Sequence, residues 1–429
     1  MVEIKKSIFI FLICYLIIIL ITEIIIRKPL YKYSESYIES IASIRNDNKT
    51  FLYNYIKIVD LVFGNFNTDI GAIFILFFHS IKDSFIYIFA FSISAYTNSL
   101  IKLIYNNPRP FWTKHTIQVR ECSLGFGNPS GHSARSTILF LTLYYYSVNF
   151  KKLEKKKILK TILIIPFLLI IFSVMYSRVF FGKHTFNQIL FGFSFGVFFY
   201  ILWFYLLEIQ NDTSKMFFDF VSSIYLYIFS FVILLLPFPI YFITSYFSNI
   251  KELEEKIPKY CFEKKKFTDN QKFFKTGLLS TMKTTSLIGS LIGFLFVKII
   301  MKNYPHVDEE TILEWKNNNL MIKTLRCIII IICGAIPKII FSKVKYKENN
   351  LIIGIIYEII ASFLNSFCIF GFGVTYSYLC FNSYINKSDI DDLDSYNQIL
   401  PNETNTDTNV DENNDVNIKT EMKKVNENV

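Results

Sequence analysis

The sequence YSRVFFGKHTFNQ (residues 176–188) joins two long apolar runs of the chain. This short connection carries Arg178, Lys183 and His184. Cationic side chains close to lipid are costly unless they face a cavity or a ligand. The stretch therefore predicts an anion site at the edge of a bundle of membrane helices.

The composition of the chain is typical of an integral membrane protein. Of its 429 residues 52% are hydrophobic and 18% aromatic, and the mean hydropathy is positive. The formal net charge of +10 comes from basic residues that cluster beside the apolar runs. Such charge flanks membrane spans, and the chain has no basic domain with interleaved aromatic residues, so we expect no nucleic-acid partner.

The hydropathy pattern predicts an all-α fold, a polytopic bundle of transmembrane helices. Apolar runs of about 20 residues are typical of bilayer spans. Six runs lie in the first half of the chain and form one unit, and about four additional spans follow. The expected spans cover residues 7–26, 66–81, 84–105, 133–150, 158–176, 188–207, 220–241, 284–301, 325–341 and 351–381.

The same pattern divides the chain into five parts. They are an N-terminal span at 1–30, a polar connecting segment at 31–65, a core at 66–210, an additional transmembrane region at 211–385 and an acidic, Asn-rich tail at 386–429. The tail has the composition of a disordered segment.

Charge also predicts the orientation of the first six spans. The basic run KKLEKKK (residues 151–157) and the lysines Lys5 and Lys6 favour the cytosolic side. The polar connections at 109–132 and 177–184 then face the lumen or the exterior. We expect a multi-pass protein of the endoplasmic reticulum or another secretory-system membrane. Glycosylation of the Asn48 sequon by the luminal machinery would check this orientation.

Three polar patterns occur in order, each at an end of a predicted span. They are KLIYNNPRP (residues 102–110), PSGH (129–132) and SRVFFGKHTFNQ (177–188). Lys102 and Arg109 are seven residues apart, about two helical turns, and share a face if the helix persists. Arg178 adds a planar donor fork that suits phosphate oxygens. Ser130 and Gly131 start a span, where backbone N–H groups favour an anion. These residues could enclose one phosphoryl group.

Together the three patterns resemble the type 2 phosphatidic acid phosphatase superfamily, which includes lipid phosphate phosphatases, glucose-6-phosphatase and polyprenyl pyrophosphate phosphatases. The resemblance makes the first six spans a phosphatase core with additional C-terminal spans. It assigns His184 as the nucleophile that forms a phosphohistidine, and His132 as the acid that protonates the leaving oxygen. Histidine suits both roles near neutral pH. With Glu121 alone between Arg109 and His132, we expect no metal site and no cofactor.

Gln188 stands where the commonest form of the third pattern has aspartate. It lies four residues after His184, so its carbonyl could accept an imidazole N–H and orient the ring, without adding negative charge. Dolichyl pyrophosphate phosphatases and glucose-6-phosphatases also carry glutamine there, so the resemblance leaves the substrate divided between them. Ser177 either caps a helix end or binds the ligand. We expect Lys114 and Trp112 to lie at the membrane interface or in solvent.

These observations predict a metal-independent membrane phosphatase for a lipid or isoprenoid phosphate monoester or pyrophosphate. The partners that we expect are this lipid or small phosphorylated substrate and the membrane lipids; the oligomeric state stays open. One alternative is a sugar phosphatase similar to glucose-6-phosphatase. The alternative from another class is a catalytically silent protein that binds or transports phosphate, because Gln188 does not support His184.

Overall fold

A computed structural model describes residues 2–46, 50–63, 68–78, 81–114, 116–117, 119, 125–149, 157–212, 223–247, 278, 281–282, 286–302, 320–343 and 351–376. Contacts divide the chain into the units Met1–Cys380 and Phe381–Val429, and every described residue belongs to the first. The Asn48 sequon, the basic residues 151–156, Glu121 and the acidic tail lie outside the described residues.

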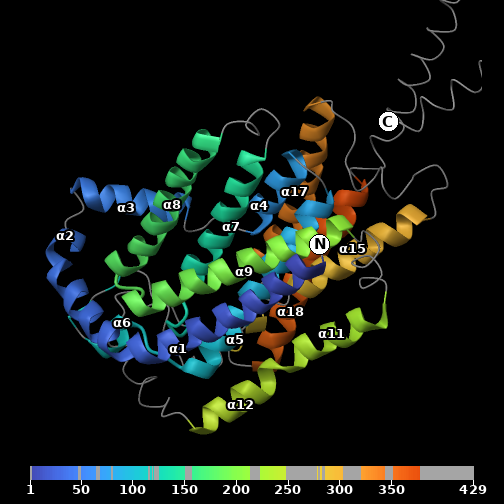
Figure 1. Ribbon diagram of the computed structural model, residues 1–429. Coiled ribbons are helices and arrows are strands. Elements are labelled where there is room, and N and C mark those ends of the chain that lie inside the picture. Colours follow the sequence, from blue (N-terminus) through green and yellow to red (C-terminus); the bar gives the residue numbers. More distant parts are fainter. Residues whose placement is uncertain are drawn as a thin grey trace, which may run out of the picture. The chain divides into compact units, whose positions relative to one another are not determined.

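The described residues form helices and connecting segments and contain no strand, which confirms the all-α prediction (Figure 1). The helices are α1 (Val2–Ser40), α2 (Ala42–Asn46), α3 (Phe51–Val62), α4 (Thr68–Phe78), α5 (Ile81–Tyr105), α6 (Pro110–Thr113), α7 (Gly131–Val148), α8 (Lys157–Phe180), α9 (Phe186–Asp212), α11 (Ile224–Leu235), α12 (Pro237–Phe247), α15 (Ser286–Lys302), α17 (Leu320–Lys343) and α18 (Leu351–Phe367), which continues as the π-helix Cys368–Gly373.

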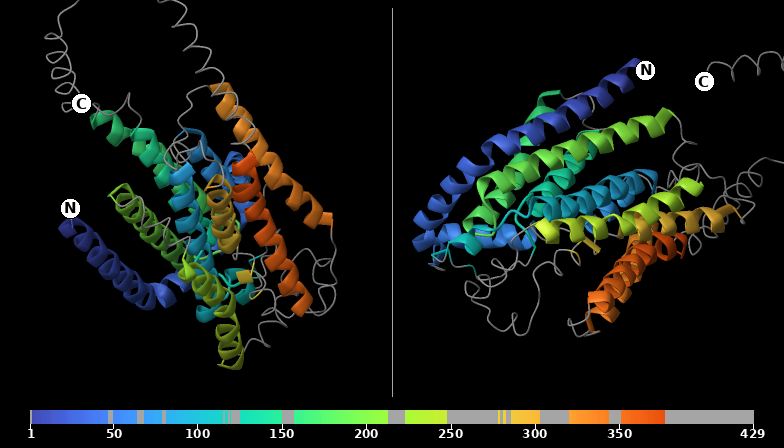
Figure 2. Two further views of the ribbon diagram at one scale, coloured as in Figure 1. Left: turned by 90° about the vertical axis from the view of Figure 1, so that its right-hand side faces the viewer. Right: turned by 90° about the horizontal axis from the view of Figure 1, so that it is seen from below.

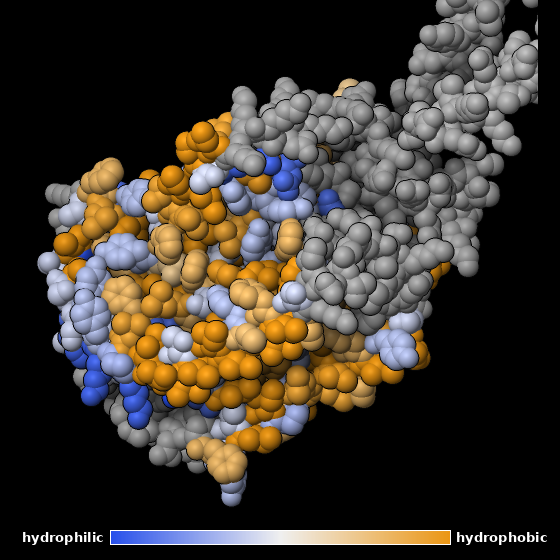
Figure 3. Space-filling view, viewed as in Figure 1, coloured by the Kyte–Doolittle hydropathy of each residue, from blue (hydrophilic) through white to orange (hydrophobic). Residues whose placement is uncertain are grey.

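Seven stretches of the described chain are long and apolar enough to cross a membrane, so the chain is a multi-pass membrane protein. They are Ser7–Ser40, Asp83–Thr113, Ile158–Phe180, Phe186–Leu206, Ile224–Phe247, Thr324–Phe341 and Ile352–Tyr376. Figure 3 shows apolar side chains over much of the face on which α1 and α9 run. A surface of this kind is typical of helices whose outer sides contact lipid.

Two N-terminal elements differ in length from the prediction. The helix α1 does not end with the apolar run but continues through Pro29 to Ser40. It does so because its second half packs on α9: the buried Ser34 hydroxyl accepts a hydrogen bond from the Phe186 N–H at 2.8 Å. The predicted second span is the helix α4, which at 11 residues is only about 16 Å long and too short to cross a bilayer alone.

Two glycines on α9 bring this helix close to α7. A Cβ atom at Gly192 would overlap the carbonyl oxygen of Ser130, and one at Gly196 would overlap Ala134. Small residues four apart allow such close approach of membrane helices. The start of α7 is therefore held against α9. The helix α1 also runs alongside α9 (Figure 2).

The C-terminal helices form a second group that contacts the first mainly through α5 and also where α17 meets α4. The helix α15 packs on α18, on the π-helix and on α5, and α12 also contacts α5. One polar contact anchors this side, since the buried Tyr96 hydroxyl of α5 donates to the carbonyl oxygen of Ile233 in α11 at 2.6 Å. The additional spans thus adjoin the core and leave the ends of α7, α8 and α9 to form the site.

Candidate active site

The three polar patterns of the sequence come together at one end of α5, α7, α8 and α9. The Ser130 N–H donates to the carbonyl oxygen of Gln188 at 2.9 Å, and the Gly127 N–H donates to that of Asn107 at 2.9 Å. These backbone bonds join the PSGH turn to the other two patterns. The predicted convergence of distant polar residues is thus present in the described structure.

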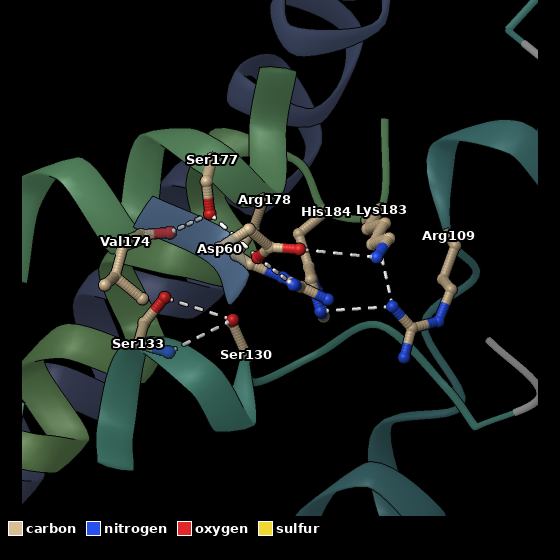
Figure 4. A network of polar contacts seen from close by, with 9 residues as sticks. All are labelled: Asp60, Arg109, Ser130, Ser133, Val174, Ser177, Arg178, Lys183 and His184. Carbon is tan, nitrogen blue, oxygen red and sulfur yellow. Dashed lines mark hydrogen bonds and ion pairs between the residues drawn. The ribbon is translucent and has the colours of Figure 1, made fainter. Parts of the chain in front are cut away.

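The turn between α8 and α9 places Arg178 and His184 side by side (Figure 4). The helix α8 ends at Phe180, and Gly182 has the left-handed φ of +67° that favours glycine after a helix end. The N–H groups of Lys183 and His184 then both donate to the Arg178 carbonyl oxygen, at 2.9 and 3.1 Å. This tight turn buries the His184 side chain to 1% exposure.

Two hydrogen bonds determine which ring nitrogen of His184 carries the proton. Nε2 lies 3.1 Å from Arg109 Nη1, and Nδ1 lies 3.2 Å from Gln188 Oε1. A guanidinium only donates, so Nε2 accepts and the proton is on Nδ1. His184 is thereby held with the lone pair of Nε2 directed toward the cationic side chains.

The amide of Gln188 is fixed by four hydrogen bonds. Its oxygen accepts from His184 Nδ1 and from the Thr185 N–H at 3.3 Å, while its nitrogen donates to Asn107 Oδ1 at 2.6 Å and to the Pro108 carbonyl oxygen at 2.8 Å. The backbone donor on one side and the backbone acceptor on the other leave only this orientation. Gly127 makes room for the amide, because a Cβ there would overlap it.

Arg109 contacts the nucleophile candidate and is itself held by backbone carbonyls. Its Nε donates to the Gly125 oxygen at 2.6 Å, and Nη1 donates to the Lys183 oxygen at 2.8 Å as well as to His184. The side chain is buried. Arg109 therefore presents a fixed positive charge directly beside Nε2 of His184.

A carboxylate that the sequence did not single out, Asp60 of α3, holds Arg178. Asp60 Oδ1 lies 2.5 Å from Arg178 Nη1 and 3.1 Å from the Ser177 hydroxyl, and Oδ2 lies 3.7 Å from Lys183 Nζ (Figure 4). Burial alone would raise the pKa of Asp60, but the charges of Arg178 and Lys183 and its hydrogen bonds outweigh burial and lower the pKa. Asp60 is thus ionised at neutral pH, and Ser177 contributes to holding it.

Lys102 and Arg135 approach the start of α7 from two sides. A Cβ atom built on Gly131 would lie 3.7 Å from Lys102 Nζ and 3.7 Å from Arg135 Nη2. Arg135 Nε donates to the Gly131 carbonyl oxygen at 3.1 Å, and its other two nitrogens have no hydrogen-bond partner among the described residues. His132 of the same turn is only partly buried, and the charges of Lys102 and Arg135 act on its ring. The sequence patterns included Lys102 but missed Arg135.

The Ser130 side chain caps α7. Its hydroxyl oxygen accepts from the Ser133 N–H at 3.4 Å and from the Ser133 hydroxyl at 3.0 Å, and the side chain is fully buried. N-cap serines stabilise a helix start in this manner. In the described structure Ser130 therefore positions the turn that carries Gly131 and His132.

A second carboxylate, which the sequence did not assign to the site, joins α1 to the loops of the site. Buried Glu23 accepts from the side-chain amides of Asn128 at 2.6 Å and Asn187 at 3.4 Å. Asn128 precedes the PSGH turn and Asn187 precedes Gln188. The only sequence signal for this contact was an acidic residue within an apolar run.

The other loop residues lie away from the site. The predicted interfacial or solvated position is wrong for Trp112, which is 1% exposed within the apolar core. Lys114 forms an ion pair of 2.5 Å with Glu39 of α1. Six of the predicted site residues surround one region: Lys102, Arg109, Gly131, His132, Arg178 and His184. Their chemical roles stay predictions.

Burial and positive charge keep His184 neutral. Burial, followed by the charges of Arg109, Arg178 and Lys102, lowers its pKa well below the ordinary 6.5, and the Gln188 hydrogen bond acts the other way. Below pH 6.5 the unfolded chain therefore binds a proton that the folded chain excludes. We expect stability to fall with pH from 6.5 down to the lowered pKa, by about 1.4 kcal/mol per unit from this group.

This pH effect is measured by thermal unfolding in detergent between pH 5 and 7.5. The His184→Gln variant provides the comparison, because it has no imidazole at this position. Its melting temperature should fall less over the same range than that of the wild type. Equal slopes for the two proteins would contradict a neutral, buried His184.

The comparisons with known proteins agree with this geometry. A family model described as the PAP2 superfamily matches residues 83–212, which contain all three polar patterns. The match confirms the resemblance drawn from those patterns, and it leaves out the helices that carry Glu23 and Asp60. Neither a curated protein nor a solved structure matches the chain.

Proposed function

We propose, on the premise that residues 83–212 belong to the PAP2 superfamily, that the chain is a membrane phosphatase for a lipid or isoprenoid phosphate monoester or diphosphate. The observation that carries the proposal is the state of His184. Its Nδ1 proton is held by Gln188, and the lone pair of Nε2 lies among cations. This arrangement supports an imidazole that attacks phosphorus.

The reaction follows from the residues around His184. The Nε2 lone pair forms a P–N bond as the bond from phosphorus to the leaving oxygen breaks, and His132 gives a proton to that oxygen. Water then attacks the phosphohistidine while His132 accepts a proton, which releases phosphate and restores both histidines. Charge stabilisation by positioned cations supplies much of the catalysis in phosphoryl transfer.

Arg109 has to exchange partners in this reaction. In the structure its Nη1 donates to Nε2 of His184, the atom that attacks. A bound phosphoryl oxygen would replace Nε2 as the acceptor, because an anion is the stronger partner for a guanidinium. This contact thus keeps the nucleophile aligned and is given up when substrate binds.

The position of the site favours an amphiphilic substrate. The residues named above lie at the ends of helices whose outer surfaces are apolar, such as α8, where Ile162 and Leu169 are exposed. An acyl or prenyl chain could lie along such a surface with its phosphate at the helix ends. Sugar phosphate hydrolysis remains the enzymatic alternative, and silent phosphate binding or transport the non-enzymatic one. Orientation toward the lumen or exterior rests on the charge pattern of the sequence.

A substrate panel tests the proposal. Purified protein in detergent with a chelator should release phosphate from phosphatidate or prenyl diphosphates, and much more slowly from glucose 6-phosphate. Orthovanadate should inhibit this release. Fast hydrolysis of glucose 6-phosphate alone would favour the sugar phosphatase, and binding of phosphate without turnover on any substrate would favour the silent protein.

Arg135 supports a diphosphate as the preferred substrate. Arg135 is exposed, and two of its nitrogens have no hydrogen-bond partner among the described residues. It lies with Lys102 beside Gly131, close enough to His132 for its charge to act on that histidine. We expect Arg135→Gln to raise KM for prenyl diphosphates about tenfold, since a hydrogen bond to a charged group is worth about 1.5–3 kcal/mol, and to leave KM for phosphatidate within about twofold. Steady-state kinetics on both substrates measure this. An equal rise in KM for both would assign Arg135 to general attraction of anions.

A further inference from the structure

Asp60 is the strongest candidate for an unassigned functional residue. It belongs to α3, which precedes the region matched by the family model, and it lies at the centre of the polar network in Figure 4. Its two oxygens contact Arg178, Ser177 and Lys183. Ser177 and Arg178 belong to the last turn of α8, and Lys183 belongs to the connection that follows it and carries His184. A carboxylate from outside the core is thus built into the phosphate site.

We propose that Asp60 is a positioning residue that sets the orientation of the Arg178 guanidinium for a phosphoryl group. The inference rests on the proposed function, since it concerns the same site. Asp60 contacts neither His184 nor the predicted attacking atom. It acts through Arg178, and it makes α3 a part of the catalytic unit.

The first argument is which edge of the guanidinium Asp60 leaves open. The carboxylate binds Nη1 at 2.5 Å, whereas Nε and Nη2 form a different edge with two parallel N–H groups. Nε of Arg178 is buried and has no hydrogen-bond partner among the described residues. A buried donor without a partner costs about 1–3 kcal/mol, so this free N–H is explained if it binds a ligand. A phosphate with two oxygens fits this edge.

The second argument is charge. Four cationic side chains lie around one region: Lys102, Arg109, Arg178 and Lys183. Without an anion, the repulsion between these charges would drive the side chains apart. Among the described residues Asp60 is the carboxylate that forms ion pairs with members of this group. It neutralises part of the charge at Arg178 and Lys183 and leaves Lys102 and Arg109 for the substrate.

The third argument is rigidity, because a positioning residue must itself be held. The helix α3 packs on α8 through buried Tyr53 and Ile56, which cluster with Phe180 (Figure 1). A polar contact of 3.1 Å between the hydroxyls of Tyr55 and Ser173 joins the same two helices. Asp60 therefore moves with α8, the helix that carries Arg178.

The experiment compares Asp60→Asn with wild type on the best substrate of the panel. We expect kcat and kcat/KM to fall together by about 10²-fold, because an Arg178 fork that is misaligned loses contacts formed in the transition state. The affinity for orthovanadate should fall in parallel. Asp60→Glu keeps the charge but shifts it by one methylene group, and its kcat should lie between the two.

Two further variants give the test its controls. Glu39→Gln removes a carboxylate that ion-pairs with Lys114 away from the site, and its kcat should stay within about twofold of wild type. Arg178→Lys lacks the planar guanidinium that Asp60 would orient. Adding Asp60→Asn to Arg178→Lys should therefore lower kcat little further, whereas two independent effects on kcat would multiply.

Each outcome bears on the proposal. If Asp60→Asn keeps kcat and vanadate affinity within about twofold of wild type, the positioning role is overturned. Where Asp60→Asn does not fold, a wild-type kcat for Asp60→Glu overturns it equally. If the wild type binds vanadate but hydrolyses nothing, the proposed function fails, while the loss of vanadate affinity in Asp60→Asn still tests the orientation of Arg178.

Discussion

Replacement of His184 by alanine should lower kcat by at least about 10⁴-fold, because the proposed reaction has no covalent step without this imidazole. The cationic side chains around His184 and the start of α7 remain in place in this variant. Substrate and orthovanadate should therefore still bind, with affinities within about tenfold of wild type. Phosphate release and vanadate binding, measured on the same preparation, separate loss of chemistry from loss of the site.

The covalent step gives a second readout of the same variant. Wild type mixed with ³²P-labelled substrate and quenched in base should retain label with the acid lability of a phosphohistidine, and His184→Ala should retain none. Release of phosphate by His184→Ala at more than about 1% of the wild-type rate would contradict the assignment of the nucleophile. It would favour a mechanism in which water attacks phosphorus without a phosphohistidine.

Replacement of Gln188 by leucine should lower kcat by about 10²- to 10⁴-fold, where the upper figure is the loss that follows when a catalytic histidine loses the partner that fixes its tautomer. Leucine cannot accept the Nδ1 proton of His184, so the ring is free to turn or to protonate Nε2. The change also leaves the Pro108 carbonyl and the Thr185 N–H without their partner. We therefore expect a lower melting temperature as well.

Gln188→Glu distinguishes two roles of Gln188, the orientation of His184 and the hydrogen bonds that hold the loop. Glutamate keeps an acceptor for His184 but turns a carboxylate oxygen toward the Pro108 carbonyl, where the native amide donates. Its kcat should exceed that of Gln188→Leu by at least about tenfold, while its melting temperature should fall to a similar degree. Equal activity of the two variants would show that Gln188 does not orient His184.

The sequence predicted the parts of this molecule that depend on local patterns. Apolar run length located most helices, and the spacing from Lys102 to Arg109 and from His184 to Gln188 identified residues that the structure brings together. The orientation of Gln188 could not be predicted, because it depends on the Pro108 carbonyl and on the Thr185 N–H.

The residues that the sequence missed act across long separations. Asp60 lies 118 positions before Arg178, in a segment that the sequence predicted as a polar connection and that contains the short helix α3. Arg135 lies one turn after the PSGH pattern and has no motif of its own. Contacts of this type depend on how α3 and α7 pack, and a single sequence does not contain that information.

The contact of Glu23 with Asn128 and Asn187 has a consequence for how the protein is made. Glu23 lies in the first span, and its two partners are 105 and 164 residues later in the chain. At 5–20 residues per second, translation reaches Asn187 roughly ten to thirty seconds after Glu23. The first helix thus enters the membrane with a carboxyl group that lacks its final partners. Its docking completes the bundle only after the loops of the site have been synthesised, which makes assembly of the site one of the last steps in biogenesis of the core.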